Sequence, residues 1–210
     1  MSSTRLDRVV FGVVLSAILL ALVGGIGWVI WLVAGTTSQT LLGVPALLDS
    51  YRAGCSTPSD GVLTDGDVIG ELRLGSEDAF VWPIVVGVGN ESLSRGIGWY
   101  PETSLPGEPG NFAVSGHRIT NGAPFADLLE FQSGERIYVK TCSANYVFEI
   151  VVPASEFVVS ADDDWVLGAL PGEPGVLPLE PLLVLITHQD LVPTPDRAVA
   201  VAKLVEMLIN

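Results

Sequence analysis

Residues Val9 to Ala34 form a run of 26 positions without a charged side chain. A helix needs ~20 apolar residues to cross the hydrocarbon core of a bilayer, so this run is long enough to span one. Trp28 and Trp31 stand near its end, where aromatic rings favour the membrane interface. The run is longer than the apolar region of a secretory signal and lacks a small-residue cleavage site, so we expect an uncleaved membrane anchor.

The charges that flank this run predict its orientation. Arg5 and Arg8 lie just before it, and basic residues tend to stay on the cytoplasmic side. We therefore expect residues 1–8 in the cytoplasm, a single-pass anchor over 9–34 in the cell membrane, and everything after it outside the cell. Residues 35–66 are rich in Thr, Ser, Gly, Pro and Asp, with one short helical-looking piece, and are predicted to form a stalk or linker before a domain over 67–210.

The composition limits the partners of this domain. The chain has 24 acidic and 10 basic residues and a net charge of −14, so its surface repels phosphate backbones and we expect no nucleic-acid partner. Cys55 and Cys142 are its two cysteines, and their spacing matches no metal motif. A disulfide between them is compatible with an extracellular location, but the sequence does not decide whether they pair.

Short apolar runs interrupted by Gly, Pro, Asn and Asp dominate the sequence from Asp67 onward. Each run has the length of a β-strand, and seven or eight of them at close spacing predict an all-β sandwich or barrel. Short helices are expected only at "APFADLLE" and "DDDWVLGAL". The strand-like runs are "VIGELRL", "AFVWPIVVGV", "NFAVSGH", "RIYVKT", "NYVFEIVV", "LLVLIT" and "RAVAVAKLV".

Polar and basic side chains stand where several of these predicted strands end or begin. His117 and Arg118 follow one strand, and Thr187 and His188 end another. Arg197 opens the next strand, nine positions after His188. A side chain at a strand end can reach the mouth of a cleft, so we predict that His117, His188 and Arg197 face one groove.

The sequence around these residues resembles the sortases, particularly the class E type of actinobacteria. "PGEPGNFAVSGHR" with "GAPF" after it resembles the catalytic-histidine region, and "LVLIT" resembles the strand that carries the nucleophile. The similarity extends over about residues 67–206. It implies a closed eight-stranded β-barrel with short helices, with His117 as the catalytic histidine and Arg197 as the arginine that steadies the substrate and oxyanion. Thr187 and Arg118 would then lie in the substrate groove.

One position departs from the family pattern: His188 stands where a sortase has its nucleophilic cysteine. Sortases use that thiolate to cleave a sorting signal, hold the acyl fragment as a thioester and pass it to an amine of the cell wall. Without it, the resemblance implies a catalytically impaired pseudo-sortase. Such a protein would keep a groove for the sorting-signal-like peptide of a secreted surface protein, with a cell-wall amine as a further possible partner.

Two alternatives and one loop remain open on the sequence alone. The protein could be an active sortase that recruits Cys142 or uses His188 for weak hydrolysis. It could also be a metal-binding module in which His117 and His188 hold zinc or copper with Asp190 as a third ligand. The loop of three acids at 162–164 could bind calcium, but we expect a solvated loop that caps a helix at Trp165. We expect neither a cofactor nor a resident metal.

Overall fold

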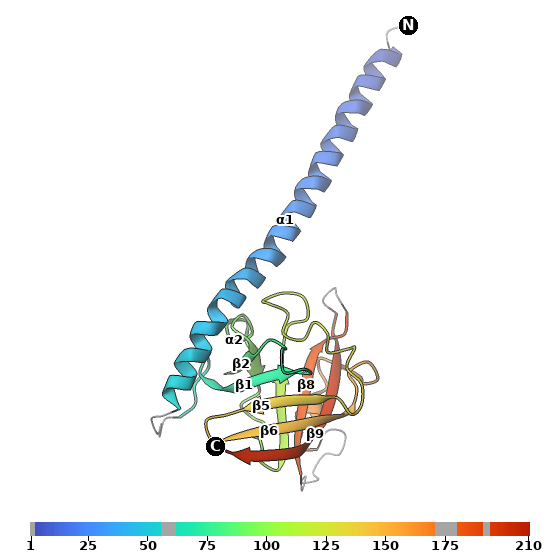
Figure 1. Cartoon of the computed structure of the whole chain (residues 1–210). Coiled ribbons are helices and arrows are strands. Elements are labelled where there is room, and N and C mark those ends of the chain that lie inside the picture. Colours follow the sequence, from blue (N-terminus) through green and yellow to red (C-terminus); the bar gives the residue numbers. More distant parts are fainter. Residues whose placement is uncertain (1–2, 56–61, 171–179, 191–193) are drawn as a thin grey trace.

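The computed structural model describes residues 3–55, 62–170, 180–190 and 194–210. One long helix, α1, leads into a β-barrel, and the two termini of the described chain lie far apart (Figure 1). The elements are α1 (Ser3–Gly54), β1 (Val68–Leu74), β2 (Trp82–Val86), α2 (Asn90–Leu93), β3 (Ile97–Trp99), β4 (Gly110–Ser115), β5 (Arg136–Lys140), β6 (Ala144–Val152), β7 (Val158–Ser160), the 3-10 helix η1 (Asp164–Leu167), β8 (Pro181–His188) and β9 (Asp196–Ile209).

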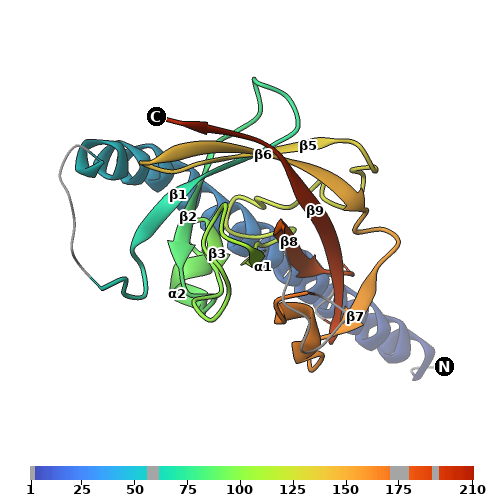
Figure 2. The same ribbon diagram turned by 90° about the horizontal axis from the view of Figure 1, so that it is seen from below.

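Eight of these strands close into a ring. They follow the order β6, β5, β1, β2, β3, β4, β8 and β9, and a pairing between β6 and β9 joins the two ends. β7 stands outside the ring and pairs only with the first residues of β9, beside which it lies in Figure 2. The expected closed eight-stranded β-barrel is therefore confirmed, and closure removes the free edges that an open sheet would expose.

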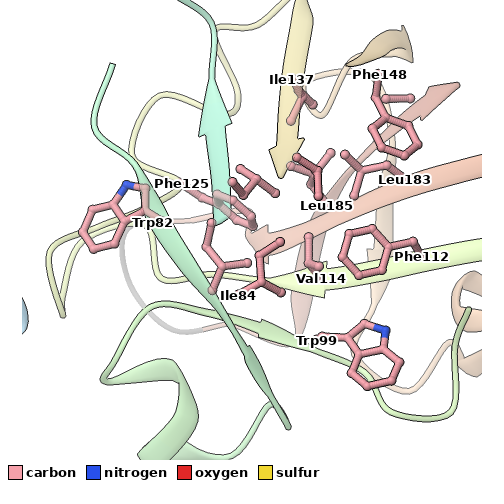
Figure 3. Close-up of a cluster of buried hydrophobic side chains, with 14 of the residues drawn as sticks. Trp82, Ile84, Trp99, Phe112, Val114, Phe125, Ile137, Phe148, Leu183 and Leu185 are labelled. Atoms are coloured by element: carbon pink, nitrogen blue, oxygen red, sulfur yellow. The ribbon is translucent and has the colours of Figure 1, made fainter. Parts of the chain in front are cut away.

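Every second residue of a strand points into the barrel, and these side chains fill its interior. Phe112 of β4, Leu183 of β8 and Phe148 of β6 are each at most 1% exposed, and they meet in one cluster with residues from the other strands (Figure 3). This alternation follows from the two-residue period of a strand. The fully buried side chains supply the apolar burial that stabilises the ring.

A second, smaller apolar cluster covers the outer face of β4, β8 and β9. It contains Ala113, Val184, Ile186 and Val199, and side chains from β7 and η1 pack over it. β8 is consequently buried on both faces, which explains why its sequence is a continuous apolar run without polar alternation. The arrangement matters for function because the polar ends of these same strands continue this outer face.

The C-terminal part of α1 packs against the barrel. Val44 and Leu48 are 2% and 5% exposed and belong to the barrel core. Arg52 donates from Nε and Nη2 to the two carboxylate oxygens of the buried Glu71, both at 2.8 Å. The helical-looking piece within 35–66 is thus the end of α1, and it packs on the barrel. By length and composition, α1 is apolar enough to span a membrane.

Of the two short helices expected inside the domain, the first is a series of turns and the second is a 3-10 helix. Residues 124–130 form consecutive turns, with Phe125 and Leu128 fully buried. The acidic loop leads into η1, but Asp163 makes no side-chain cap to it. The Asp163 carboxylate accepts a hydrogen bond from the Ser160 backbone N–H at 2.7 Å, which ties the loop to β7.

A disulfide joins Cys55 to Cys142 and fixes the end of α1 to the loop between β5 and β6. The N–H of Cys142 also donates to the Tyr51 hydroxyl at 3.0 Å. This loop lies at the far end of β9 from Arg197, because Ala144 is paired with Ile209. At ~3.3 Å per residue, about 40 Å of strand separates the disulfide from Arg197.

Replacing both cysteines by serine is expected to lower the free energy of unfolding by roughly 3–5 kcal/mol, because the bond closes a loop of 87 residues. Urea unfolding of the full chain in detergent micelles, followed by tryptophan fluorescence, measures the change. A matching loss on adding reductant to the wild type is expected. Equal midpoints for the wild type and the double variant would show that the bond contributes nothing to stability.

Candidate functional site

The parallel pairing of β4 and β8 places His117 beside His188. The paired residues run from Gly110 opposite Pro181 to Ser115 opposite Ile186 without a shift. At the end of the ladder the Gly116 N–H donates to the Ile186 carbonyl at 3.2 Å. Two side-chain bonds hold the same ends together: Thr187 Oγ1 donates to the Gly116 carbonyl at 2.9 Å, and Arg118 donates to the Gln189 carbonyl. Continued by two residues, the register sets His117 beside His188.

Close packing holds the loop that follows β4. The backbone N–H of Phe125 donates to the His117 carbonyl at 3.0 Å, so the chain folds back over the end of the strand. A Cβ at Gly116 would lie 2.8 Å from the Phe125 ring, and glycine is required for this approach. The position of His117 is thus fixed by the close approach of Gly116 to the Phe125 ring and by the backbone bond from Phe125.

Antiparallel pairing of β8 and β9 sets Arg197 directly opposite His188. Directly opposite residues of two neighbouring strands share a face, and that face is the one on which Ile186 and Val199 join the outer cluster. His117, two residues beyond Ser115, continues the same face. We call the group of His117, His188 and Arg197 the strand-end site.

Thr187 faces the other way. Its side chain is 2% exposed, and its hydroxyl is used in the bond to Gly116. Adjacent residues of a strand point to opposite faces, so a threonine beside His188 belongs to the barrel side. The structure therefore gives Thr187 a role in joining β4 to β8, unlike the groove position expected from the sequence.

Tyr100 is close to the site and was not among the residues predicted from the sequence. It packs against the outer cluster, and burial raises the pKa of its hydroxyl, while Ser115 and the charge of Arg197 oppose that rise. Tyr100 lies just after β3, a strand of three residues without a recognisable pattern. Only the tertiary structure brings it to the end of β4.

Both histidines have pKa values below the ordinary 6.5. Burial is the larger cause for each of them. The second cause is repulsion: His188 disfavours the charged form of His117, and Arg197 disfavours that of His188. At neutral pH the site therefore holds two uncharged imidazoles beside one guanidinium, a set that can donate and accept hydrogen bonds and exchange a proton.

Backbone carbonyls hold the guanidinium of Arg197. Its Nη1 donates to Thr194 at 2.7 Å and to Asp196 at 3.1 Å. Asp190, the expected third metal ligand, is exposed and accepts a hydrogen bond from the Thr194 hydroxyl at 3.2 Å. Within the described part of the chain, no three His, Cys, Asp or Glu side chains are grouped to hold a metal ion. A metal-binding module at this site would therefore have only His117 and His188 as candidate ligands.

Cys142 is not available as a replacement nucleophile. Its sulfur is bonded to Cys55, and it lies at the opposite end of β9 from Arg197. The chain has only these two cysteines, so the folded protein presents no free thiol. An active enzyme that recruits Cys142 is therefore incompatible with this structure.

Comparison with known proteins agrees with the barrel. A family model of the sortase domain matches residues 76–205. The chain belongs to the sortase family. Sortase SrtE1 of Streptomyces coelicolor is 30% identical over 138 residues, which are 61% of this chain. This sortase chain spans only 37% of the length of that relative.

Solved sortase structures share this fold over most of the chain. The SrtF sortase from Corynebacterium diphtheriae has a TM-score of 0.63 and 26% identity, covering 73% of this chain and 92% of its own. Sortase E1 from Streptomyces coelicolor, solved with a tripeptide in its active site, has a TM-score of 0.60 and 24% identity, covering 70% and 94%. The second match shows the shared fold. The resemblance to sortases read from the sequence is thus confirmed at the level of family and barrel.

The titration of the histidines tests this geometry. In Arg197→Met, the pKa of His188 is expected to rise toward 6.5, because a neighbouring positive charge is removed. The pKa of His117 should change less, because that pKa is lowered by burial and by the neighbouring His188. Resolved NMR titrations of the two ring signals measure both values, with Arg136→Met, on the exposed start of β5, as the control variant. Equal shifts of both histidines, or none, would contradict the arrangement.

Proposed function

We propose that this protein is a membrane-anchored, extracellular pseudo-sortase that binds a sorting-signal-like peptide without transferring it. The observation that carries the proposal is the end of β8. A histidine stands there, at the position that the resemblance assigns to the nucleophilic cysteine, and both cysteines of the chain are joined in a remote disulfide. The strand-end site keeps a histidine and an arginine, but no thiol.

The chemistry of the two side chains explains why activity should be lost. A thiolate attacks the amide carbonyl and forms a thioester as the amine of the amide leaves, and a second amine then attacks the thioester and displaces the thiolate. A neutral imidazole is a weaker nucleophile toward an unactivated amide, and an acyl-imidazole hydrolyses before it can be transferred. Any residual reaction through His188 would therefore be slow hydrolysis. Removal of one member of a catalytic unit leaves only the contribution of binding and oxyanion stabilisation.

Retention of a peptide site is supported by the residues around this substitution. His117 and Arg197 remain on the outer face of β4 and β9, and Arg118 holds the chain after His188 through the Gln189 carbonyl. Sortase E1 has the same fold and was solved with a tripeptide in its active site, which supports a peptide as the class of ligand. The peptide would come from a secreted surface protein, and a cell-wall amine would be a second partner.

The membrane location rests on α1. Its apolar N-terminal part is predicted to cross the bilayer, with the N-terminus in the cytoplasm because of Arg5 and Arg8. Its C-terminal part docks on the barrel through Val44 and Leu48. The barrel would then lie outside the cell, close to the membrane surface, where sorting signals emerge.

The variant His188→Cys tests the assignment of the lost nucleophile. We expect the wild type to form no covalent adduct with a fluorogenic LAxTG-type peptide and to release no fluorescence above background. His188→Cys should acquire an acyl adduct on the new thiol, detectable by mass spectrometry, because His117 and Arg197 already stand beside it. We expect at most partial turnover, since the surrounding geometry is fitted to an imidazole.

Matched variants make the result specific. His188→Ala should stay free of adduct, and the double variant His188→Cys with His117→Ala should acquire less adduct than His188→Cys alone. Adduct formation on Cys142 in any variant would overturn the proposal. So would a wild-type cleavage rate equal to that of an active sortase measured in the same assay.

A further inference from the structure

Within the described part of the chain, Arg197 has no negatively charged partner, although the protein is strongly acidic. The chain carries 24 acidic against 10 basic residues, yet the salt bridges found within the described ranges all involve Arg52. Asp190 and Asp196 are neighbours of Arg197, but neither carboxylate pairs with it, and Asp190 binds Thr194. A half-buried cation left without a counter-ion in such a protein indicates a place for an anion from outside.

The geometry of the guanidinium favours a planar anion. Nη1 donates to two backbone carbonyls, which fixes the plane of the group. Among the described residues no hydrogen bond uses Nε or Nη2, and neither atom is buried without a partner. These two nitrogens form the edge that binds a carboxylate through two parallel hydrogen bonds. Arg197 is therefore held in place with its carboxylate-binding edge open.

The surroundings supply further unpaired polar groups. Five buried side-chain atoms in the described chain lack a hydrogen-bond partner, and three of them belong to Arg118, His188 and Gln189. Folded proteins leave few such atoms unpaired. Only His188 Nδ1 belongs to the strand-end site, because Arg118 and Gln189 each follow one of the histidines and strand alternation turns them to the other face. The two uncharged imidazoles beside the guanidinium can donate hydrogen bonds without adding charge, which suits a ligand with one negative charge and hydrogen-bond acceptors.

We propose that the strand-end site binds the free α-carboxylate at the C-terminus of a peptide, with Arg197 as its bidentate partner and His188 beside it. This inference rests on the proposed function and narrows it. An uncut sorting signal presents a neutral amide at this place, whereas a cleaved one presents a carboxylate. The ligand class is therefore a peptide that has already been cut, and the protein recognises the product of a peptide hydrolysis carried out elsewhere.

The overall charge argues against a polyanion as the ligand. A phosphate polymer would bring many negative charges against a surface with a net charge of −14, which raises the electrostatic cost of approach. A peptide with a single terminal carboxylate brings one. The open guanidinium edge of Arg197 matches that single charge, so a peptide terminus is favoured over a phosphate-bearing polymer.

Three matched peptides test the proposal on the full chain in detergent micelles. They are an LAxT-type tetrapeptide ending in a free carboxylate, the same tetrapeptide ending in a carboxamide, and an uncut LAxTG-type peptide that continues beyond the motif. Calorimetry measures the three affinities. We expect the free acid to bind at least about tenfold more tightly than the carboxamide, because only the acid forms the charged bidentate pair.

Substitutions identify the group responsible for the preference. Arg197→Met should reduce the acid-to-amide ratio to about one while changing carboxamide binding less than about twofold. Arg136→Met, on the exposed start of β5, should leave the ratio unchanged. Acetate added to the wild type should shift the His188 ring signal in NMR spectra. In Arg197→Met the same addition should leave it in place.

The outcomes separate this inference from the proposed function. If the uncut peptide and the carboxamide bind as tightly as the free acid, the carboxylate inference is wrong and peptide binding stands. If no peptide binds, the proposed function fails and the inference fails with it. If inorganic phosphate displaces the free acid at lower concentration than acetate does, the site prefers phosphate and the carboxylate assignment is overturned.

Discussion

The position of every residue in the strand-end site depends on the parallel pairing of β4 and β8. The pairing has one register throughout, and Thr187 extends it by one hydrogen bond beyond the last ladder pair. Because parallel strands share a direction, their carboxyl ends meet at one place, and His117 and His188 leave the barrel together. β9 then returns beside β8 and brings Arg197 back to the same end. Loss of this ladder would separate the site before it disturbed the distant disulfide.

The electrostatic character of the strand-end site follows from two imidazoles beside one guanidinium. The imidazole of His188 lies opposite Arg197 on the neighbouring strand. That group stays uncharged beside Arg197, because burial and repulsion both lower its pKa. Among the described residues, no carboxylate pairs with the positive charge of Arg197.

Strands with strong apolar patterns could be predicted from the sequence, and so could the residues at their ends. β8 is an example, because burial on both faces gives it an unbroken run of apolar residues. β3 and β7 were missed because three residues carry no period, and their place is set by neighbours distant in the chain. Thr187 shows a different limit. The prediction that the strand ends at His188, next to Thr187, was correct. Which face of the barrel each side chain occupies could not be predicted, because it depends on how the strand pairs with its neighbours.

The continuity of α1 has a mechanical consequence. The helix runs without a described break from its apolar part to the residues that dock on the barrel, and Arg52 and the disulfide secure its last turns. If the apolar part spans the bilayer, only a turn or two separates the membrane end at Ala34 from the contact of Thr40 with Ser94. At ~1.5 Å per residue this is about 9 Å of rigid rod. The barrel is then held at a short, fixed distance above the membrane. It can bind only those peptide C-termini that pass within that distance of the lipid surface.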